Sequence, residues 1–339
     1  MFVTRNLVIS FAMIAILGVL DALSKGDLLP PDAGLGDNLR FMFLRAPLLY
    51  EQVFSFAFLL SLLVTYVMLI RRNELVAIAG AGMSGARQIK ALVPIVLLMS
   101  VASLVLIDQA APRAQQALTS WLGPEAVTKN SEPLGELWLA DEDVLVRIKT
   151  VEKDQLFDLT FVERIDRGRV SSVSFAEEAT ADDDGWRLSN VTQVRFDDND
   201  VNPPQYWTSS LTPETLRLLS LEPRYLSVTD LWDLSQLQGS GNRSSSAYLV
   251  WIFSRLALPI AAIGFLIITV STMQKFGRNP NAELTLVAVM AGGFVYVVVD
   301  NISKTLPENS RVDPALAALA PVVCLLLVGF LLASRSTKN

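Results

Sequence analysis

The chain has 339 residues, of which 51% are hydrophobic and 18% charged; its formal net charge is −6 and its mean hydropathy is +0.41. This balance is too apolar for an ordinary soluble domain and too charged for a wholly buried bundle, so the composition predicts a protein that is part membrane and part aqueous. Because the chain has no histidine and a single cysteine, Cys324, it cannot form an internal disulfide, a metal site of His or Cys, or a Ser–His or Cys–His catalytic pair.

Six apolar runs are each long enough to cross a bilayer, which takes about 17 to 25 helical residues. Three runs precede a long polar insert and three follow it. No small-x-small cleavage pattern follows the first run, so we interpret it as a retained helix rather than a signal peptide. The sequence therefore predicts an α-helical membrane protein with six transmembrane helices arranged 3+3, near residues 7–23, 48–70, 91–107, 248–273, 284–299 and 314–333.

The short loops between these runs differ in charge, and the loops richer in Lys and Arg face the cytoplasm. Arg71, Arg72, Arg87 and Lys90 fall on one side of the membrane, as do the bases near both chain ends, whereas the loops on the other side are rich in aspartate. We therefore predict that both termini are cytoplasmic and that the insert lies outside the cell membrane.

A short hydrophilic stretch, which begins Arg71-Arg72-Asn73-Glu74, follows the second run. Leu75, Ile78 and Ala79 recur at i, i+3 and i+4, which is the spacing of one apolar helix face. This pattern favours a short helix that lies along the membrane surface, where a soluble partner can bind. The alternative is a solvated loop whose charges only set the orientation.

Residues 80–85 match the letters of a GxGxxG dinucleotide fingerprint. That fingerprint works only within a strand–turn–helix unit, and here a membrane span lies on each side. We therefore predict that these glycines end one short helix and turn the chain into the next. No GxxxxGK[ST] motif occurs, so the chain cannot hydrolyse ATP through a P-loop of its own.

The central insert changes character along its length. It opens with a helical extension of the third run to about residue 122, and short segments rich in Val, Phe, Leu and Thr follow at 144–149, 156–165, 170–176 and 186–196. Acidic and glycine-containing turn clusters separate them, which is typical of an antiparallel β sandwich or jelly roll. Helix starts follow at Thr212-Pro213-Glu214 and at Ser227. The residues expected to line the inside of the β domain are Phe157, Leu159, Phe161, Val173 and Phe175.

Charged residues near the spans form a second group of candidates. Basic residues near the outer ends of the spans can hold phosphate groups, or they can extend to ordinary lipid headgroups. Arg255 lies only a few residues inside the fourth run, and Glu51 lies just inside the second. A charge at that depth faces a wet cavity or forms a structural ion pair, and both readings stay open. The outer bases are Lys25, Arg40, Arg45, Arg113 and Lys304.

Several motifs in a fixed order carry a family resemblance. Residues 72–78 read Arg-Asn-Glu-Leu-Val-Ala-Ile, residues 81–84 read Ala-Gly-Met-Ser, and 137–141, 185–188, 211–214, 222–227 and 293–297 carry further matches. Together with the order of three spans, β insert and three spans, they resemble the LptF/LptG family of lipopolysaccharide-export permeases, the LptG branch more than LptF.

The resemblance implies three parts: residues 1–107 with transmembrane helices 1–3 and a cytoplasmic coupling helix at about 72–88, a periplasmic β-jellyroll domain with helical connections at 108–247, and transmembrane helices 4–6 at 248–339. It implies a multi-pass protein of the bacterial inner membrane, with a periplasmic central domain. The protein would be a permease subunit without ATPase activity that passes lipopolysaccharide to a periplasmic bridge. The implied partners are an LptB ATPase dimer, an LptF-like permease, LptC and the periplasmic bridge protein, with no nucleic acid, cofactor or metal.

The resemblance also implies roles for particular residues. Glu74 would be the glutamate that contacts the ATPase, and the headgroup of the lipid would meet bases near the first span. This chain has Gly18 and Ser24 where relatives tend to carry further lysines. The expected coupling residues are Glu74, Arg72, Leu75 and Ile78, and the expected headgroup contacts are Lys25, Arg45, Arg40 and Lys304.

Other functions stay open from the sequence alone. One is an LptF-type half of the same transporter, and another is a membrane-anchored periplasmic β domain that acts in signalling or as a chaperone. The second would need only one span, and this chain has about six. An intramembrane enzyme is disfavoured because the chain has no histidine and no evident pair of acids inside a span.

Overall fold

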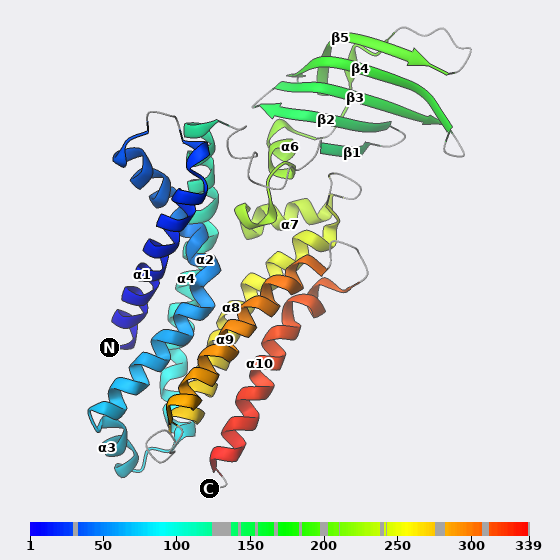
Figure 1. Cartoon of the computed structure of the whole chain (residues 1–339). Helices are drawn as coiled ribbons and strands as arrows, with labels where there is room; N and C mark the ends of the chain where they lie inside the picture. The colour runs from blue at the N-terminus through cyan, green and yellow to red at the C-terminus, as the bar shows by residue number, and fades with distance from the viewer. Residues whose placement is uncertain are drawn as a thin grey trace. The chain divides into compact units, whose positions relative to one another are not determined.

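The structure is a computed structural model of the chain, and it describes residues 1–29, 33–123, 137–141, 144–152, 155–165, 169–182, 185–196, 203–209, 211–237, 241, 243–274, 282–306 and 312–337. The chain divides into two compact units (Figure 1). A membrane unit contains Met1–Leu118 and Leu249–Asn339, and a β unit contains Thr119–Tyr248.

Six helices of the described chain are long and apolar enough to cross a membrane, which confirms the predicted class. The second span starts earlier than predicted, because polar residues at its start are helical and Asp37 accepts a hydrogen bond from the backbone N–H of Gly34 at 3.0 Å. The six are α1 (Phe2–Ser24), α2 (Leu35–Arg71), α4 (Gly85–Leu122), α8 (Ser245–Met273), α9 (Ala282–Thr305) and α10 (Pro314–Thr337).

The core of the membrane unit lies around α2 and α8, whose apolar side chains are the most deeply buried. The rings of Phe265 on α8 and Tyr296 on α9 meet edge to face, with centroids 5.1 Å apart. Gly293 brings α9 against Leu59 of α2, where a Cβ atom would collide with the leucine side chain. Figure 1 shows α8, α9 and α10 as neighbours, and Gly264 of α8 lies against Leu325 of α10.

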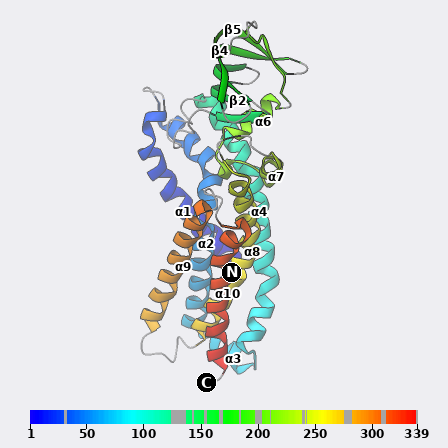
Figure 2. The same cartoon turned by 90° about the vertical axis from the view of Figure 1, so that its right-hand side faces the viewer.

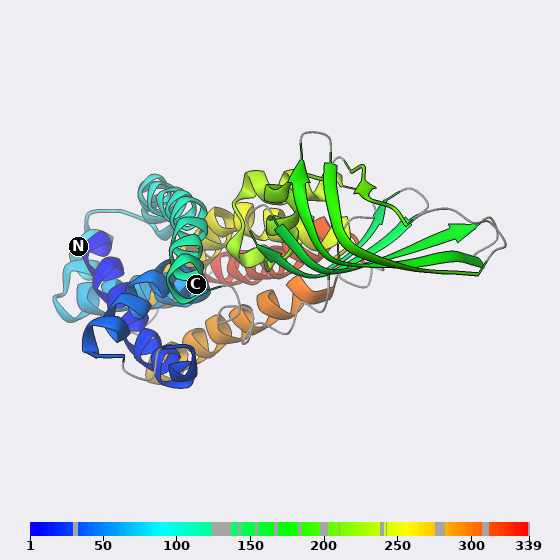
Figure 3. The ribbon, with the colours of Figure 1, turned by 90° about the horizontal axis from the view of Figure 1, so that it is seen from above.

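The β unit contains one antiparallel sheet of six strands, and each strand pairs with its neighbours in sequence. The described strands therefore form a single curved sheet, a half-barrel, rather than two stacked sheets (Figure 3). Only two or three residues separate each strand from the next between β2 and β5, and connections this short place successive strands next to each other. The strands are β1 (Leu137–Asp141), β2 (Val144–Glu152), β3 (Gln155–Ile165), β4 (Arg169–Asp182), β5 (Gly185–Arg195) and β6 (Tyr206–Trp207).

Helices follow the sheet at both predicted starts. Thr212 caps α6 (Pro213–Leu219) by accepting a hydrogen bond from the N–H of Thr215 at 3.2 Å. Ser227 and Asp230 form a reciprocal capping box at the start of α7 (Val228–Gln236). A 3₁₀ turn, η2 (Pro223–Tyr225), lies between them, and a second one, η1 (Gly26–Leu28), follows α1. The sequence pattern missed β1 and β6, which are too short for a clear alternation.

Four polar residues, one on each of the strands β2 to β5, form a row across the sheet. The alternation of inward and outward side chains changes phase at this row. On β3, Leu156 and Leu159 are 0% and 1% exposed although they lie three residues apart, whereas a regular strand turns every second residue to one face. On β4, Ala176 and Ala179 repeat this spacing. Backbone pairing continues on both sides of the row and is interrupted at it. We call this set the polar row: Lys149, Asp158, Glu177 and Asn190.

Two members of the polar row have left-handed backbone, with φ of 54° at both Asp158 and Asn190. Aspartate and asparagine tolerate this conformation better than other non-glycine residues. Their side chains also bridge neighbouring strands, because Asp158 pairs with Lys149 at 2.9 Å and Asn190 donates to Glu177 at 2.8 Å. The row therefore lets both halves of the sheet turn apolar residues toward the same face.

The reversal corrects part of the predicted lining. Leu159 and Phe161 are buried, as expected. The prediction is wrong for Phe157, which is half-buried and lies on the face opposite to its neighbour Leu156, because the alternation of β3 changes phase at Asp158. The prediction is also wrong for Phe175, which is 46% exposed, and for Val173, because both lie on the opposite face from Ala176. Single-strand alternation does not say which face is inside, and on β4 the inner face carries small residues instead.

Candidate functional site

The short helix α3 (Glu74–Gly80) follows α2 at the end of the bundle where α10 also ends (Figures 1 and 2). Asn73 separates the two helices with a left-handed backbone, φ 56°. Leu75 is 9% exposed and belongs to the core of the membrane unit, whereas Val76 is 68% exposed. One side of α3 is therefore held by the bundle and the other side faces outward.

The predicted coupling residues divide between these two sides. Glu74 starts the helix, and its carboxylate lies 3.9 Å from Arg72 with both side chains about half exposed, so this ion pair is weak. Leu75 is inward, and Ile78 is half-buried. The structure thus places the acid where a second protein can reach it and uses the leucine to hold the helix in place.

The glycines after α3 act as the sequence predicted. Gly80 is the last residue of α3, Gly82 has a φ of 76°, and α4 begins at Gly85. The loop is tied to the bundle through Gln88, whose amide nitrogen lies 3.4 Å from the carbonyl of Met83 and whose oxygen lies 3.4 Å from the hydroxyl of Tyr66. No strand precedes this glycine run among the residues that the structure describes.

At the other end of the bundle, where α1 connects to α2 (Figure 1), two predicted headgroup residues come together. Arg45 donates two hydrogen bonds to Asp21, at 2.7 and 3.3 Å, and Lys25 lies 3.3 Å from the same carboxylate. Arg45 is only 7% exposed, whereas the side chain of Lys25 is 24% exposed. Asp21 was missed as a partner, although its position four residues before Lys25 is the spacing of a helical ion pair.

The remaining predicted bases lie elsewhere in the unit. Lys304 on α9 pairs with Asp300 at 2.8 Å and lies over the ring of Trp251, 5.2 Å from its centroid. Arg113 donates to Gln109 at 3.0 Å, one turn back on α4. Arg40 is exposed on the first turns of α2.

Arg255 lies at the centre of a buried ionic cluster, which decides between the two readings in favour of the ion pair. Its side chain is 1% exposed; Nε lies 3.2 Å from Oε1 of Glu51 on α2, and Nη1 lies 3.7 Å from Oδ1 of Asp108 on α4. Asp108 was missed as a partner of Arg255, because it lies just beyond an apolar run, where the sequence predicts that the polar insert begins. We call Glu51, Asp108 and Arg255 the charged triad.

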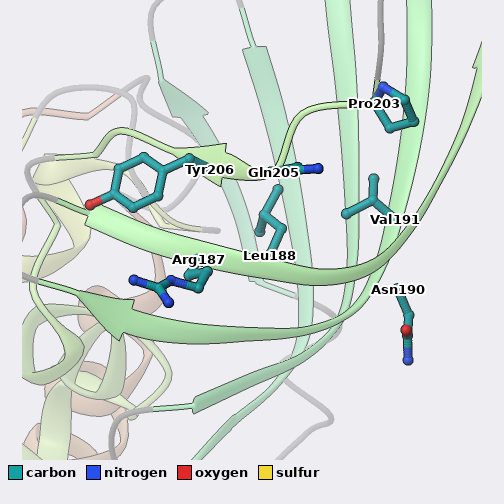
Figure 4. Close-up of a pocket in the computed structure, with 7 residues that line it drawn as sticks. All are labelled: Arg187, Leu188, Asn190, Val191, Pro203, Gln205 and Tyr206. Atoms are coloured by element: carbon teal, nitrogen blue, oxygen red, sulfur yellow. The ribbon is translucent and has the colours of Figure 1, made fainter.

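The β unit carries an aromatic cluster and a pocket. Trp207 stacks on Trp186 at 6.4 Å and meets Phe161 edge to face at 5.6 Å. The pocket has a volume of about 560 Å³ and mixes polar with apolar side chains from β5 and from the segment leading into β6 (Figure 4). Its lining residues are Arg187, Leu188, Asn190, Val191, Pro203, Gln205 and Tyr206. Among the described residues there is no group of three potential metal ligands.

Comparisons with known proteins agree with this architecture. Residues 2–335 match the family model described as lipopolysaccharide export system permease LptF/LptG. The chain is 25% identical to the lipopolysaccharide export system permease protein LptG of Escherichia coli strain K12, over 96% of this chain and 94% of that protein. It is 22% identical to the protein of the same name from Haemophilus influenzae, over 84% of this chain and 82% of that protein.

Proposed function

The chain belongs to the LptF/LptG family of lipopolysaccharide export permeases, and we propose that it is the LptG-like half of an ABC transporter for this lipid. As a multi-pass inner-membrane protein, it would take lipopolysaccharide from the outer leaflet and pass it to a periplasmic bridge. The energy would come from ATP hydrolysis in a separate LptB dimer, with an LptF-like chain as the second permease half and LptC in the bridge. In this proposal the termini and α3 face the cytoplasm and the β unit faces the periplasm.

The observation that carries the proposal is the two-sided environment of α3. Leu75 fixes the helix to the bundle, while Glu74 is left on the accessible side. An acid in that position can pair with a basic residue of a soluble partner and pass its movement to the bundle. Arg72 would orient the carboxylate, and Ile78 would add apolar contact.

At the outer end, Lys25 and Arg45 are proposed to meet the phosphates of the lipid headgroup, with Arg40 and Lys304 as further contacts. Lys25 and Arg45 both contact the carboxylate of Asp21, so two positive charges lie close together at this end of the unit. Adjacent cations of this kind attract the phosphates of a headgroup. Since Arg45 is buried, Lys25 is the member of the pair that a lipid reaches first.

The test is a charge reversal on α3. Glu74→Arg should lower the amount of ATPase that co-purifies with the chain and reduce ATP turnover of the complex about tenfold or more, because losing a close interfacial charge pair costs about 2–5 kcal/mol. The amount of co-purified ATPase and the rate of phosphate release measure the two effects.

The matched control is Glu283→Arg, which makes the same charge change at an exposed acid in the first turn of α9. It should leave both quantities near those of the unmodified complex. The proposal is contradicted when Glu74→Arg changes neither quantity, or when both variants lower them equally.

An LptF-type half is the second candidate, because the family model that matches the chain covers both halves. Co-expression distinguishes the two. An LptG-like chain should assemble with an LptF-like partner and not with a second LptG-like chain.

A further inference from the structure

The charged triad joins helices that lie far apart in the sequence. Arg255 is on α8, the first span after the β unit, whereas Glu51 and Asp108 are on α2 and α4, which precede it. A charge that is 1% exposed must be paired, because an isolated buried ion is strongly destabilising. Arg255 therefore holds α8 to two other spans.

The two carboxylates are not equivalent partners. The contact with Glu51 is the shorter one, 3.2 Å against 3.7 Å for Asp108, and the Glu51 side chain is 11% exposed against 20% for Asp108. The guanidinium of Arg255 contacts two carboxylates, and Oε2 of Glu51 is buried without a hydrogen-bond partner. Arg255 can consequently give up the longer contact and stay paired through the shorter one.

The packing of α4 gives this asymmetry a direction. Helices α2 and α8 supply most of the buried side chains of the membrane core, and Val96 is the buried side chain that α4 adds to them. The apolar part of α4 is also much less buried than those of α2 and α8. Of these three spans, α4, which carries Asp108 and is reached from α3 through the loop after Gly80, is therefore the one that can shift with the smallest loss of packing.

We propose that Arg255 is a positioning residue of the transport cycle, which keeps its contact with Glu51 and releases its contact with Asp108 as α4 moves against α8. Helices α2 and α8 then move as one body, and α4 is the element that shifts. This inference rests on the proposed function, since it needs a partner that moves α3.

Spin labels beside the triad test the movement directly. Gln52, Gln109 and Leu256 are exposed neighbours of Glu51, Asp108 and Arg255, and Cys324→Ser removes the natural thiol. In the complete complex, the distance between labels at 109 and 256 should change by about 3 Å or more when the ATPase is trapped with nucleotide and vanadate. The distance between labels at 52 and 256 should stay constant.

Two substitutions separate positioning from mere stability. Asp108→Asn should leave the yield of the complex and its ATP turnover within about twofold of those of the unmodified protein. The amount of lipopolysaccharide released per ATP should nevertheless fall about fivefold. Asp108→Glu should restore this release. Glu51→Gln should lower the yield, because Arg255 loses its closer partner. Asp233→Asn, at an exposed aspartate of α7, is the control and should change neither quantity.

The inference is overturned when both label distances change alike, when neither changes, or when Asp108→Asn lowers yield as much as Glu51→Gln does. Failure of the proposed function looks different. In that case the unmodified complex itself releases no lipopolysaccharide in response to ATP, whatever the label distances are.

Discussion

Asp21 organises the proposed headgroup site, because its carboxylate holds both Lys25 and Arg45. A lipid phosphate at this site must therefore compete with the carboxylate of Asp21 for these two bases. The buried guanidinium of Arg45 is fixed in direction, whereas the more exposed Lys25 can turn toward a ligand.

A photo-crosslinking amino acid at position 25 tests this arrangement in cells. It should trap lipopolysaccharide, because this is the position at which Lys25 is proposed to meet the phosphates of the headgroup. The same probe in place of Phe11, a 75% exposed residue of α1, is the control and should give several-fold less adduct. Equal yields at the two positions, measured by immunoblot of the adduct, contradict a headgroup role for Lys25.

The sequence showed which charged residues lie inside or near the spans, but it did not show which residues they contact. The run lengths alone placed Glu51 and Arg255 inside spans, and the choice between cavity and ion pair stayed open. The answer depends on how α2, α4 and α8 are rotated about their axes. That rotation follows from packing such as the approach of Gly293 to Leu59, which periodicity in a single sequence does not reveal.

At the scale of elements, the capped helices and the long strands were predicted well. Thr212 and Ser227 mark their helix starts through side-chain hydrogen bonds that depend only on local sequence. The inner face of β4 was predicted wrongly, because Val173 and Phe175 are the larger residues but the small residues Ser174 and Ala176 beside them face inward. The inward position of Ala179 beyond the polar row also could not be predicted from this strand alone. The change of side-chain alternation at the polar row involves neighbouring strands together, so the pattern of one strand does not reveal it.

The left-handed backbone of Asp158 makes a prediction about the polar row. Asp158→Val should destabilise the β unit by about 1–2 kcal/mol, because a β-branched residue resists a positive φ. Asp158→Gly should cost less than about 1 kcal/mol, since glycine accepts the backbone and only an exposed ion pair is lost. Hydrogen exchange of the β3 and β4 amides in the full chain measures both.

Thr180→Val, at an exposed position of β4 with ordinary strand backbone, is the control for the added β-branched side chain. It should be neutral or slightly stabilising. If Asp158→Gly proves as destabilising as Asp158→Val, the loss of the ion pair with Lys149, and not the left-handed backbone, accounts for the destabilisation.

For the whole molecule, the succession of three spans, a β insert and three spans follows directly from hydropathy. Long apolar runs are a strong signal because a bilayer leaves few alternatives to a helix. Alternation along the insert indicated antiparallel strands, but it did not decide between a two-layer sandwich and the single described sheet. The family match over residues 2–335 then assigns this architecture to lipopolysaccharide export.

The central claim is that this chain moves lipopolysaccharide at the expense of ATP hydrolysed by another subunit. The most direct measurement is the release of labelled lipopolysaccharide from proteoliposomes that contain the chain, an LptF-like partner, LptB and LptC, into a soluble periplasmic acceptor. The account predicts release that requires ATP and is lost with Glu74→Arg. Release at the same rate without ATP, or from vesicles that lack this chain, would contradict it.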